Sequence, residues 1–290
     1  MKKHILRKYR ELLMKVGIVA CSNGQPQSED VNIEKLQSVL DANNIKTTYS
    51  QYIFAKDSVF NASAKQRADA LMSMYLDDEI TDIFDISGGD VANGILNFLD
   101  FEIIGRSSKR FWGYSDLTTI VNAIYAQTGR ESILYQIKNV IHDQSGVDTT
   151  DLINIISGAN SNLFDFDYDF VSGNHMSGTV IGGNIRCFLK LAGTKYMPDF
   201  TGKILVLESL GSGIAQLETH LSQLEQLDAF NKINGLVLGT FTSMEKQNAV
   251  PNVLTLLKNH VPNDLPIAVT KYIGHGVDSK AICIGGKLDL

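Results

Sequence analysis

The sequence predicts an α/β protein built around a parallel, doubly wound sheet and followed by a second α/β unit. In the first half of the chain, short apolar runs rich in β-branched residues alternate with longer segments whose apolar residues recur at helical spacing. Turn-forming residues such as glycine, serine and asparagine follow several of these runs. Strands that alternate with helices in this way form parallel sheets, because each helix returns the chain to the edge where the next strand begins.

The first unit is clearest at its N-terminal end. The run Val16-Gly-Ile-Val-Ala20 ends in Cys-Ser-Asn-Gly, and residues 29–42 then repeat apolar side chains at helical spacing, which predicts a strand, a loop and a helix. The same reasoning predicts a strand at 47–54, a helix at 62–76, a strand at 82–86, a helix at 91–99, a strand at 110–114, a helix at 117–126 and a strand at 132–135.

The pattern changes after about residue 140, where helical periodicity weakens. Residues 164–170 alternate aromatic and acidic side chains, as in a strand with one solvated face. We expect the boundary within 143–162 and divide the chain into domains at 1–150 and 151–290. The second domain should contain a bend at 182–183, a helix at 184–191, a strand at 203–207, a helix at 214–230, a strand at 235–239, a helix at 250–260 and a strand at 267–269.

Composition and charge indicate the class of partner. The chain has 290 residues, 44% hydrophobic and 20% charged, which is enough for two ordinary cores. A formal net charge of −6 without long runs of one sign disfavours a nucleic-acid binder or an anionic-membrane binder. A small-molecule partner therefore remains the expectation. The sequence also lacks the motifs for a dinucleotide, a P-loop nucleotide and a structural zinc ion.

Cysteine usage and the N-terminus favour a cytoplasmic location. The three cysteines, Cys21, Cys187 and Cys283, are scattered and odd in number, unlike a secreted disulfide framework. The longest apolar stretches fall far short of the roughly 20 residues of a spanning helix. The first residues are basic, but charges interrupt any apolar signal segment, so export is not expected. We interpret residues 1–13 as a start-site extension, because Met14 directly precedes the first strand.

The sharpest local motif is Phe111-Trp-Gly-Tyr-Ser-Asp-Leu117, in which a strand stops at Gly113 and Ser115 stands at the turn into a helix. Such an elbow exposes a serine hydroxyl and aims the N–H groups of the helix at an oxyanion beside it. The match to G-x-S-x-G is partial, because Leu117 replaces the second glycine. An ordinary helix cap is the alternative, and this motif alone favours it.

Three other loops carry candidate groups. Gly88-Gly89 follows a predicted strand, where paired glycines either cradle an oxyanion or only form a tight turn. Glu208 ends another apolar run, and a surface glutamate is the alternative there. His275 lies between two glycines that leave its imidazole accessible, and His175 is the only other histidine that is a candidate site residue. The chain order of Ser115, Glu208 and His275 is that of the α/β-hydrolases.

At these positions the chain resembles the serine LD-carboxypeptidase family, which includes the muropeptide LD-carboxypeptidases and the microcin C immunity hydrolases. The matching blocks, in the family's order and spacing, are Gly88-Gly89, 96–101, 108–118, Gly182-Gly183-Asn184, Gly193-Thr194, 202–208, 235–239 and Gly274-His275-Gly276. The resemblance covers residues 15–288. It implies a Rossmann-like (flavodoxin-like) N-terminal domain, a smaller C-terminal α/β domain with extra strands, and a homodimer.

The resemblance also implies roles for single residues. Ser115 resembles the nucleophile, His275 the general base and Glu208 the acid that orients the histidine. The backbone N–H groups of Gly89 and Asp116 correspond to the oxyanion hole. The same resemblance implies that no metal and no organic cofactor takes part.

The chain departs from the family pattern at two places. Ser87-Gly-Gly-Asp90 replaces an Arg-Gly-Gly-Tyr run, and Leu217-Glu-Thr-His220 replaces an acidic-basic pair after the acid block. We expect both near the substrate walls. The aromatic residues within 164–170 either line a pocket or are buried in a strand.

The expected function is that of a cytoplasmic serine peptidase. An LD-carboxypeptidase would hydrolyse the amide bond between the L-centre of a diamino acid and the terminal D-alanine of cell-wall muropeptides, through an acyl-enzyme. The first alternative is a hydrolase of the microcin C immunity type, which cleaves the amide of an aminoacyl-nucleotide. The second is a small-ligand-binding protein without catalysis. In each case the partner is small, and neither a nucleic acid nor a membrane is expected.

Overall fold

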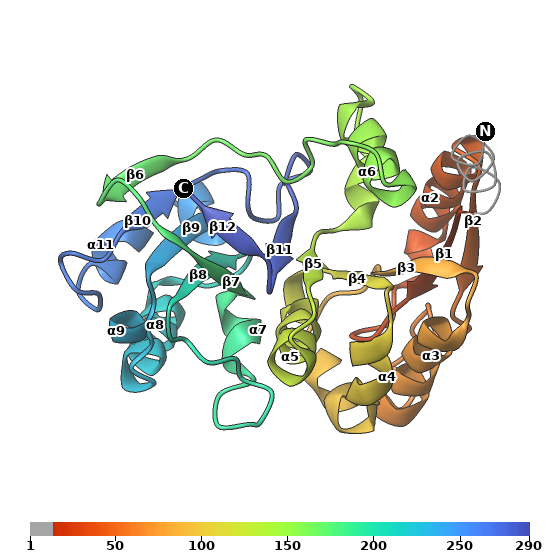
Figure 1. The fold of residues 1–290 in the computed structure, drawn as a ribbon, viewed down its shortest axis with the longest axis horizontal. Coiled ribbons are helices and arrows are strands. Elements are labelled where there is room, and N and C mark those ends of the chain that lie inside the picture. Colours follow the sequence, from red (N-terminus) through yellow and green to blue (C-terminus); the bar gives the residue numbers. More distant parts are fainter. Residues whose placement is uncertain (1–13) are drawn as a thin grey trace.

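Two six-stranded sheets form the frame of the protein in a computed structural model that describes residues 14–290 (Figure 1). The first sheet contains β1 (Met14–Val19), β2 (Ile45–Tyr49), β3 (Ile80–Asp85), β4 (Arg110–Gly113), β5 (Ser132–Leu134) and β11 (Ile282–Ile284). The second contains β6 (Asp169–Ser172), β7 (Ser177–Asn184), β8 (Lys203–Ser209), β9 (Gly235–Phe241), β10 (Ile267–Val269) and β12 (Lys287–Asp289). The interpretation of residues 1–13 lies outside the described residues.

Both sheets are parallel at their centres; the first has one antiparallel edge strand, β11, and the second has two, β12 and β6. The strand orders are β11-β5-β4-β3-β1-β2 and β12-β7-β8-β9-β10-β6. Strands β1 to β5 pair in parallel, as do β7 to β10, whereas β11, β12 and β6 each pair antiparallel to a neighbour. The predicted α/β class, with parallel sheets and extra strands, is confirmed.

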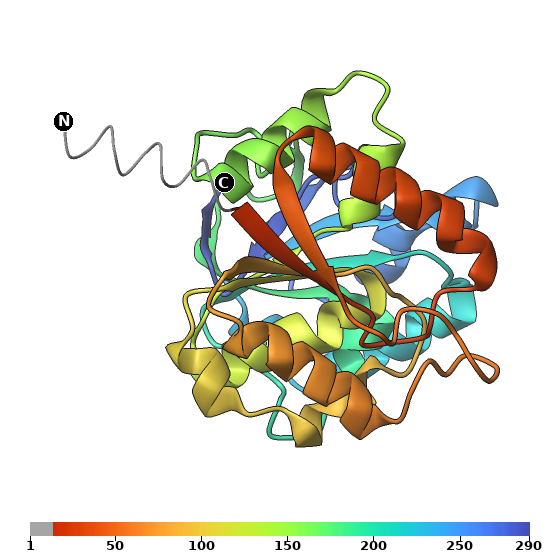
Figure 2. The same cartoon turned by 90° about the vertical axis from the view of Figure 1, so that its right-hand side faces the viewer.

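Helices cover both faces of the first sheet (Figure 2). They are η1 (Gln27–Glu29), α2 (Asp30–Ala42), α3 (Ala64–Leu76), η2 (Ala92–Phe98), α4 (Phe101–Arg106), η3 (Ser115–Leu117), α5 (Thr118–Thr128), η4 (Ile137–Ile141) and α6 (Val147–Ser157). Ile18 packs in the same cluster as residues of α2 and α6, whereas the next residue, Val19, packs with α3 and α5. Successive strand residues point to opposite faces, so burial of both faces explains the continuous apolar runs of the sequence.

The second sheet has its own helices. They are α7 (Ile185–Leu189), α8 (Ile214–Gln226), α9 (Ala229–Lys232), α10 (Thr242–Lys246) and α11 (Val253–Leu257). A separate apolar cluster joins Leu217, Leu221 and Leu224 of α8 to alternate residues of β8, among them Leu205 and Leu207. This second core explains why the sequence pattern is that of two α/β units.

The prediction of a strand at 164–170 is wrong for most of its length. Only Asp169 and Phe170 belong to β6, and the residues before them form a turn and irregular chain. We call the first sheet with its helices the first lobe, and the second sheet with its helices the second lobe. This segment crosses from the first lobe to the far edge of the second sheet, and it reaches a partner strand, β10, only at its end (Figure 1). The aromatic rings contact one another instead, with the Phe166 and Tyr168 ring centroids 6.4 Å apart.

The chain does not keep its two halves strictly apart. The expected division at 150/151 falls inside α6, and β11 returns from the C-terminal segment to pair with β5 of the first sheet. Figure 1 shows β11 between the two lobes. The domain limits themselves stay a prediction.

A buried amide joins the two lobes at the end of β7. Gly182 and Gly183 have positive φ angles of 101° and 126°, so the predicted bend occurs inside a strand. Asn122 of α5 donates to the Gly182 carbonyl at 2.8 Å and accepts from the Gly182 N–H at 2.9 Å. Thr118 of the same helix accepts from the Asn184 N–H at 3.1 Å. These contacts set the position of the second sheet against the helix that follows Ser115.

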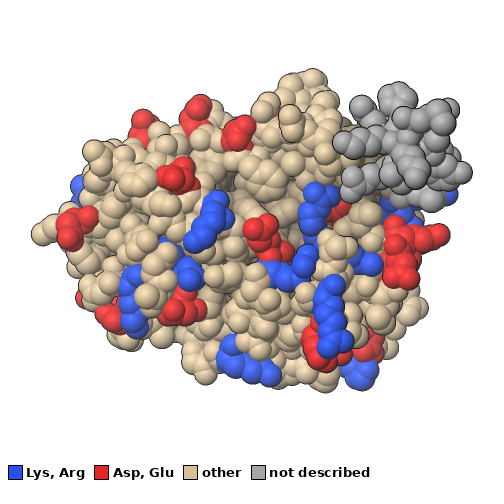
Figure 3. All heavy atoms as spheres, in the orientation of Figure 1, with Lys and Arg blue, Asp and Glu red and all other residues tan. Residues whose placement is uncertain are grey.

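The described residues contain no helix that is both long and apolar enough to cross a membrane. On the face shown in Figure 3, acidic and basic side chains are interspersed.

Replacing Asn122 by alanine should weaken the contact between α5 and β7. The substitution leaves the buried N–H and C=O of Gly182 without their partners, so we expect Asn122→Ala to lower the free energy of unfolding by about 2 kcal/mol. Urea denaturation measures this change. Asn231→Ala, on the exposed surface of α9, is the control and should change stability little. Equal stability of the two variants would show that the Asn122–Gly182 contact does not stabilise the fold.

Candidate active site

Ser115 lies on a sharp turn between β4 and α5. Tyr114 is extended, with φ −141°, and Ser115 then has a positive φ of 54°, which is uncommon for a residue other than glycine. The short helix η3 begins at Ser115 and leads directly into α5. The elbow predicted from the sequence is therefore present, and the helix N-terminus lies beside the serine hydroxyl.

Glu208 and His275 meet in the second lobe. The Glu208 side chain, at the end of β8, is fully buried, and its Oε2 lies 2.8 Å from Nδ1 of His275. The other carboxylate oxygen accepts from the Asn184 side chain at 3.0 Å. Because a carboxylate only accepts hydrogen bonds, His275 donates from Nδ1 and its Nε2 is free to accept a proton. Among the described residues, Nε2 is buried and has no hydrogen-bond partner.

Backbone contacts hold the His275 loop in place. The carbonyl of Ile273 accepts from the N–H of Thr240 at 2.8 Å, and the carbonyl of Gly274 accepts from the Ser279 hydroxyl at 2.6 Å. A side chain at Gly274 would overlap the Thr240 hydroxyl, so glycine is required next to the imidazole. The Tyr114 ring meets the imidazole edge-on at 4.8 Å between centroids. Burial raises the pKa of Tyr114 well above its usual value, and the Glu208 charge raises it further.

A single pocket of about 280 Å³ brings the candidate groups of both lobes together. Ser115, Gly88 and Gly89 line it from the first lobe, and His275 lines it from the second. Ser115 and His275, which are 160 positions apart, thus share one cavity, and Glu208 contacts the imidazole from below the surface. The structure brings together every residue of the expected nucleophile, base and acid set.

Gly89 lines the pocket and has a backbone conformation that favours glycine. Its φ of 113° is accessible to glycine alone, and a side chain there would overlap the amide of Asn23. The Asn23 N–H donates to the Gly88 carbonyl at 3.1 Å, which fixes the peptide unit that carries the Gly89 N–H. Within residues 14–290 the Gly89 N–H itself has no acceptor. Asp116 directly follows Ser115, and its side chain is completely buried.

The remaining sequence candidates lie elsewhere. His175 contacts the carbonyl of Leu290 at 2.8 Å, near the C-terminus, and does not line this pocket. Of the departures from the family pattern, Ser87 lines the pocket, but the segment 217–220 lies on α8, where Glu218 contacts His260. None of the aromatic residues within 164–170 lines the pocket.

Two lysines of the pocket were not singled out from the sequence. Lys138 of η4 donates to Gln25 at 2.9 Å and lies 3.4 Å from the Glu29 carboxylate. Lys280 forms a closer ion pair with Asp148 at 2.8 Å. No acidic side chain is among the residues lining this pocket, so its walls carry positive charge. Lysines in unremarkable loops provide no spacing signal, and only their convergence in space identifies them.

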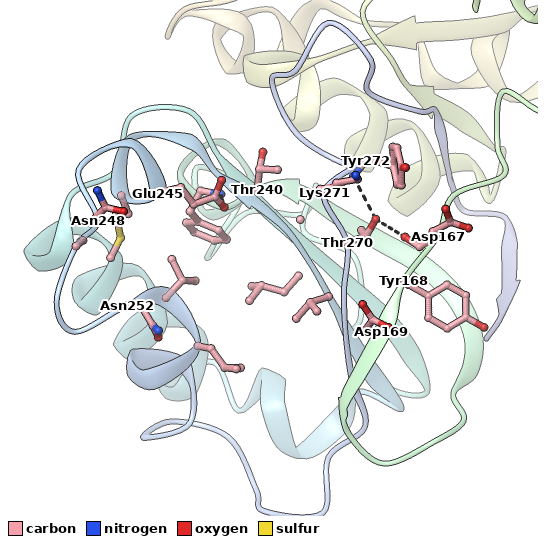
Figure 4. A pocket seen from close by; sticks show the side chains of 18 residues that line it. Asp167, Tyr168, Asp169, Thr240, Glu245, Asn248, Asn252, Thr270, Lys271 and Tyr272 are labelled. Atoms are coloured by element: carbon pink, nitrogen blue, oxygen red, sulfur yellow. Dashed lines mark hydrogen bonds between the residues drawn. The ribbon is translucent and has the colours of Figure 1, made fainter.

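A larger cavity of about 980 Å³ lies in the second lobe, between β6, β10 and the α10–α11 segment (Figure 4). Its floor is apolar, with Leu238, Phe241 and Met244, and Thr240 and Thr270 line it near the His275 loop. It contains none of the expected site residues. The described residues also contain no group of three or more His, Cys, Asp or Glu side chains that could hold a metal ion.

Comparison with known proteins places this chain in a family. The model of the LD-carboxypeptidase N-terminal domain matches residues 16–135, and that of the LD-carboxypeptidase C-terminal domain matches residues 177–290. The chain is thus a hydrolase of the serine carboxypeptidase type. It belongs to the LD-carboxypeptidase family.

Individual relatives are distant. A Treponema pallidum (strain Nichols) protein named as a carboxypeptidase is 23% identical over 99% of this chain and 91% of its own. The Escherichia coli microcin C7 self-immunity protein MccF is 29% identical over 62% of this chain and 61% of its own. A structure of MccF in complex with glutamyl sulfamoyl guanosine covers 96% of this chain and 93% of its own, with a TM-score of 0.84 and 19% identity. The muramoyltetrapeptide carboxypeptidase of Oxalobacter formigenes covers 95% and 94%, with a TM-score of 0.76 and 22% identity.

Replacing Glu208 by glutamine should reverse the tautomer of His275. The Asn184 amide already donates to one oxygen, so the glutamine would turn its own oxygen to Asn184 and its NH₂ group to Nδ1. Nδ1 would then accept, and the neutral imidazole would carry its proton on Nε2. Nitrogen-15 NMR of the histidine side chains measures this directly.

Glu225→Gln is a matched control, because Glu225 also lies 2.8 Å from a histidine Nδ1, that of His260, outside the pocket. It should leave the His275 signals unchanged. A Glu208→Gln variant that kept the Nδ1–H form would contradict the assigned hydrogen-bond pattern.

Proposed function

We propose that this protein is a serine LD-carboxypeptidase that removes the terminal D-alanine from cell-wall muropeptides. The observation that carries the proposal is the shared pocket, which Ser115, Gly89 and His275 line together while Glu208 holds the imidazole, and in which Nε2 of His275 has no partner among residues 14–290. Serine hydrolases of the triad type combine a nucleophile, a base, an acid that orients the base and an oxyanion hole.

In the proposed reaction, His275 takes the Ser115 proton at Nε2 as the hydroxyl attacks the amide carbonyl. The oxyanion that forms is stabilised by the backbone N–H groups of Gly89 and Asp116. His275 then gives the proton to the leaving D-alanine amine, and the acyl-enzyme on Ser115 remains. Water, activated by the same nitrogen, attacks the ester and restores the serine. The buried Glu208 keeps Nδ1 protonated throughout and stabilises the imidazolium that forms.

The positive walls of the pocket support a substrate with a free carboxylate near the scissile bond. A carboxypeptidase substrate carries this group on its last residue. We propose that Lys138 binds it, because within the part of the chain that the structure describes its ammonium has one nearby carboxylate, at 3.4 Å, whereas Lys280 is closely paired with Asp148. The homodimer and the cytoplasmic location expected from the sequence stay predictions.

A second candidate function has a specific basis. MccF, whose structure holds an aminoacyl-nucleotide analogue, shares the fold of this chain with a TM-score of 0.84. A hydrolase of that type would cleave the amide of an aminoacyl-nucleotide. The two candidates differ in the group that leaves when the amide is cleaved, which is D-alanine in one and a nucleotide in the other.

Ser115→Ala should abolish release of D-alanine from a muramyl tetrapeptide. Losing the nucleophile costs about 10⁶-fold in a related serine mechanism, so turnover should fall to background. Mass spectrometry of the products measures it. Ser58→Ala is the matched control, because Ser58 is an exposed serine with a similar φ of 52°. Intact turnover by Ser115→Ala would contradict the mechanism.

The same assay with an aminoacyl-sulfamoyl nucleotide separates the two candidate functions. Cleavage of the tetrapeptide alone supports the carboxypeptidase. Cleavage of the nucleotide alone supports the immunity-type hydrolase and overturns the proposed substrate.

Lys138→Met should raise KM for the tetrapeptide by about tenfold, as expected for one lost hydrogen bond to a charged group, with little change in kcat. A tetrapeptide amide, which lacks the carboxylate, should be processed equally poorly by the wild type and the variant. Lys65→Met, on the exposed face of α3, is the control. An unchanged KM for the free acid would exclude Lys138 as the carboxylate site.

A further inference from the structure

The ammonium group of Lys190 joins the two segments that contain the proposed oxyanion-hole donors. Lys190 directly follows α7 in the second lobe. Its Nζ lies 2.5 Å from Oδ1 of Asp116, 2.9 Å from the Asp90 carbonyl and 3.2 Å from the Asp90 carboxylate. These three contacts match the three protons of an ammonium group. One side chain of the second lobe therefore contacts both the residue after Ser115 and the residue after Gly89.

The Asp116 carboxylate connects the loops that surround the nucleophile. It is completely buried, and its Oδ2 accepts from the Ser22 hydroxyl at 2.6 Å and from the Ala92 N–H at 2.8 Å. Ser22 follows β1 and Ala92 follows the Gly88-Gly89 turn, so three loops of the first lobe meet at this carboxylate. A buried carboxylate needs a cation as well as hydrogen-bond donors, and Lys190 supplies it.

A second cation, within α7, holds the other side of Gly89. Arg186 pairs with the Asp90 carboxylate and donates to the Gly89 carbonyl at 3.2 Å. The N–H of Asp90 donates to the Asn23 side chain at 3.0 Å. The peptide units before and after Gly89 are thus both held. The Arg186–Asp90 pair is exposed, so its contribution is to geometry more than to stability.

We propose that Lys190, assisted by Arg186, is a positioning residue that aligns the N–H groups of Gly89 and Asp116, so that the second lobe completes the oxyanion hole of the first. This inference rests on the proposed function, because it assumes that these two amides bind the oxyanion. It also gives a role to Asp90, which stands where the family run has tyrosine. In this chain the position carries a carboxylate that both Arg186 and Lys190 contact.

The test uses the reaction of Ser115 with a fluorophosphonate, which needs no knowledge of the natural substrate. The serine oxygen bonds to phosphorus, fluoride leaves and His275 takes the proton, while negative charge grows on the phosphonyl oxygen. Lys190→Met should slow this labelling by about 100-fold, the usual cost of a displacement near 1 Å in an active site. With the tetrapeptide, kcat should fall by a similar factor and KM should stay within about threefold, because the oxyanion forms only after binding.

Two further variants keep the test independent of folding. Lys190→Arg keeps the charge and should recover at least a tenth of the labelling rate. Lys190→Met combined with Asp116→Asn removes the unpaired buried charge and keeps the Asp116 backbone; it should fold as the wild type does and still label slowly. Lys232→Met, an exposed lysine of the same lobe, is the control.

Slow labelling in the folded double variant together with rescue by arginine supports the inference. Wild-type labelling rates in the folded double variant overturn it, because the alignment then does not depend on Lys190. If the wild-type protein labels Ser115 but cleaves no tetrapeptide, the proposed substrate is wrong. The labelling rates of the Lys190 variants then still test whether Lys190 aligns the oxyanion hole. If the wild-type Ser115 does not label at all, the proposed function and the inference fail together.

Discussion

The contact between the two lobes along α5, β7 and α7 is the constraint on which the rest of the structure depends. The first lobe supplies the serine on its strained turn and the paired glycines, and the second supplies the imidazole and its carboxylate. Neither lobe alone contains a complete site. The buried amide of Asn122 and the partly buried ammonium of Lys190 both lie at this contact, and their directional hydrogen bonds favour one orientation of the lobes.

Burial and hydrogen bonding determine how Glu208 holds His275. Glu208 has no access to solvent, and both of its oxygens are occupied, one by Asn184 and one by His275. Because an ionised carboxylate only accepts hydrogen bonds, this contact leaves the histidine a single arrangement, with the proton on Nδ1. Asn184 also accepts the helix N–H of Cys187, which ties this arrangement to the start of α7. Through Asn184 at its start, Arg186 within it and Lys190 directly after it, α7 is therefore connected to both the proposed base and the proposed oxyanion hole.

Much of the first lobe could be predicted because its strands are buried on both faces and therefore read as apolar runs between glycine-containing loops. The position of Ser115 could be predicted for the same reason, since the strand ends where its apolar run ends. The prediction of strands failed where the local sequence pattern did not match the strand pairing of the fold. Residues 164–168 alternate like a strand but have no neighbouring strand, whereas β11 and β12 are short and form only because β5 and β7 offer them an edge. Lys138 and Lys190 carry no local signal at all, because their importance comes from partners that are 109 and 74 positions away in the chain.

The central claim is that one catalytic site forms where the two lobes meet, with Ser115 as its nucleophile. The most direct test is a crystal structure of the protein after reaction with a peptide boronic acid ending in a D-alanine analogue. The account predicts a covalent bond from the Ser115 oxygen to boron, one boronate oxygen within hydrogen-bond distance of the Gly89 and Asp116 amides, and His275 Nε2 beside the adduct. Boron bound to another residue, or a Ser115 adduct whose oxygen points away from both amides, would contradict it.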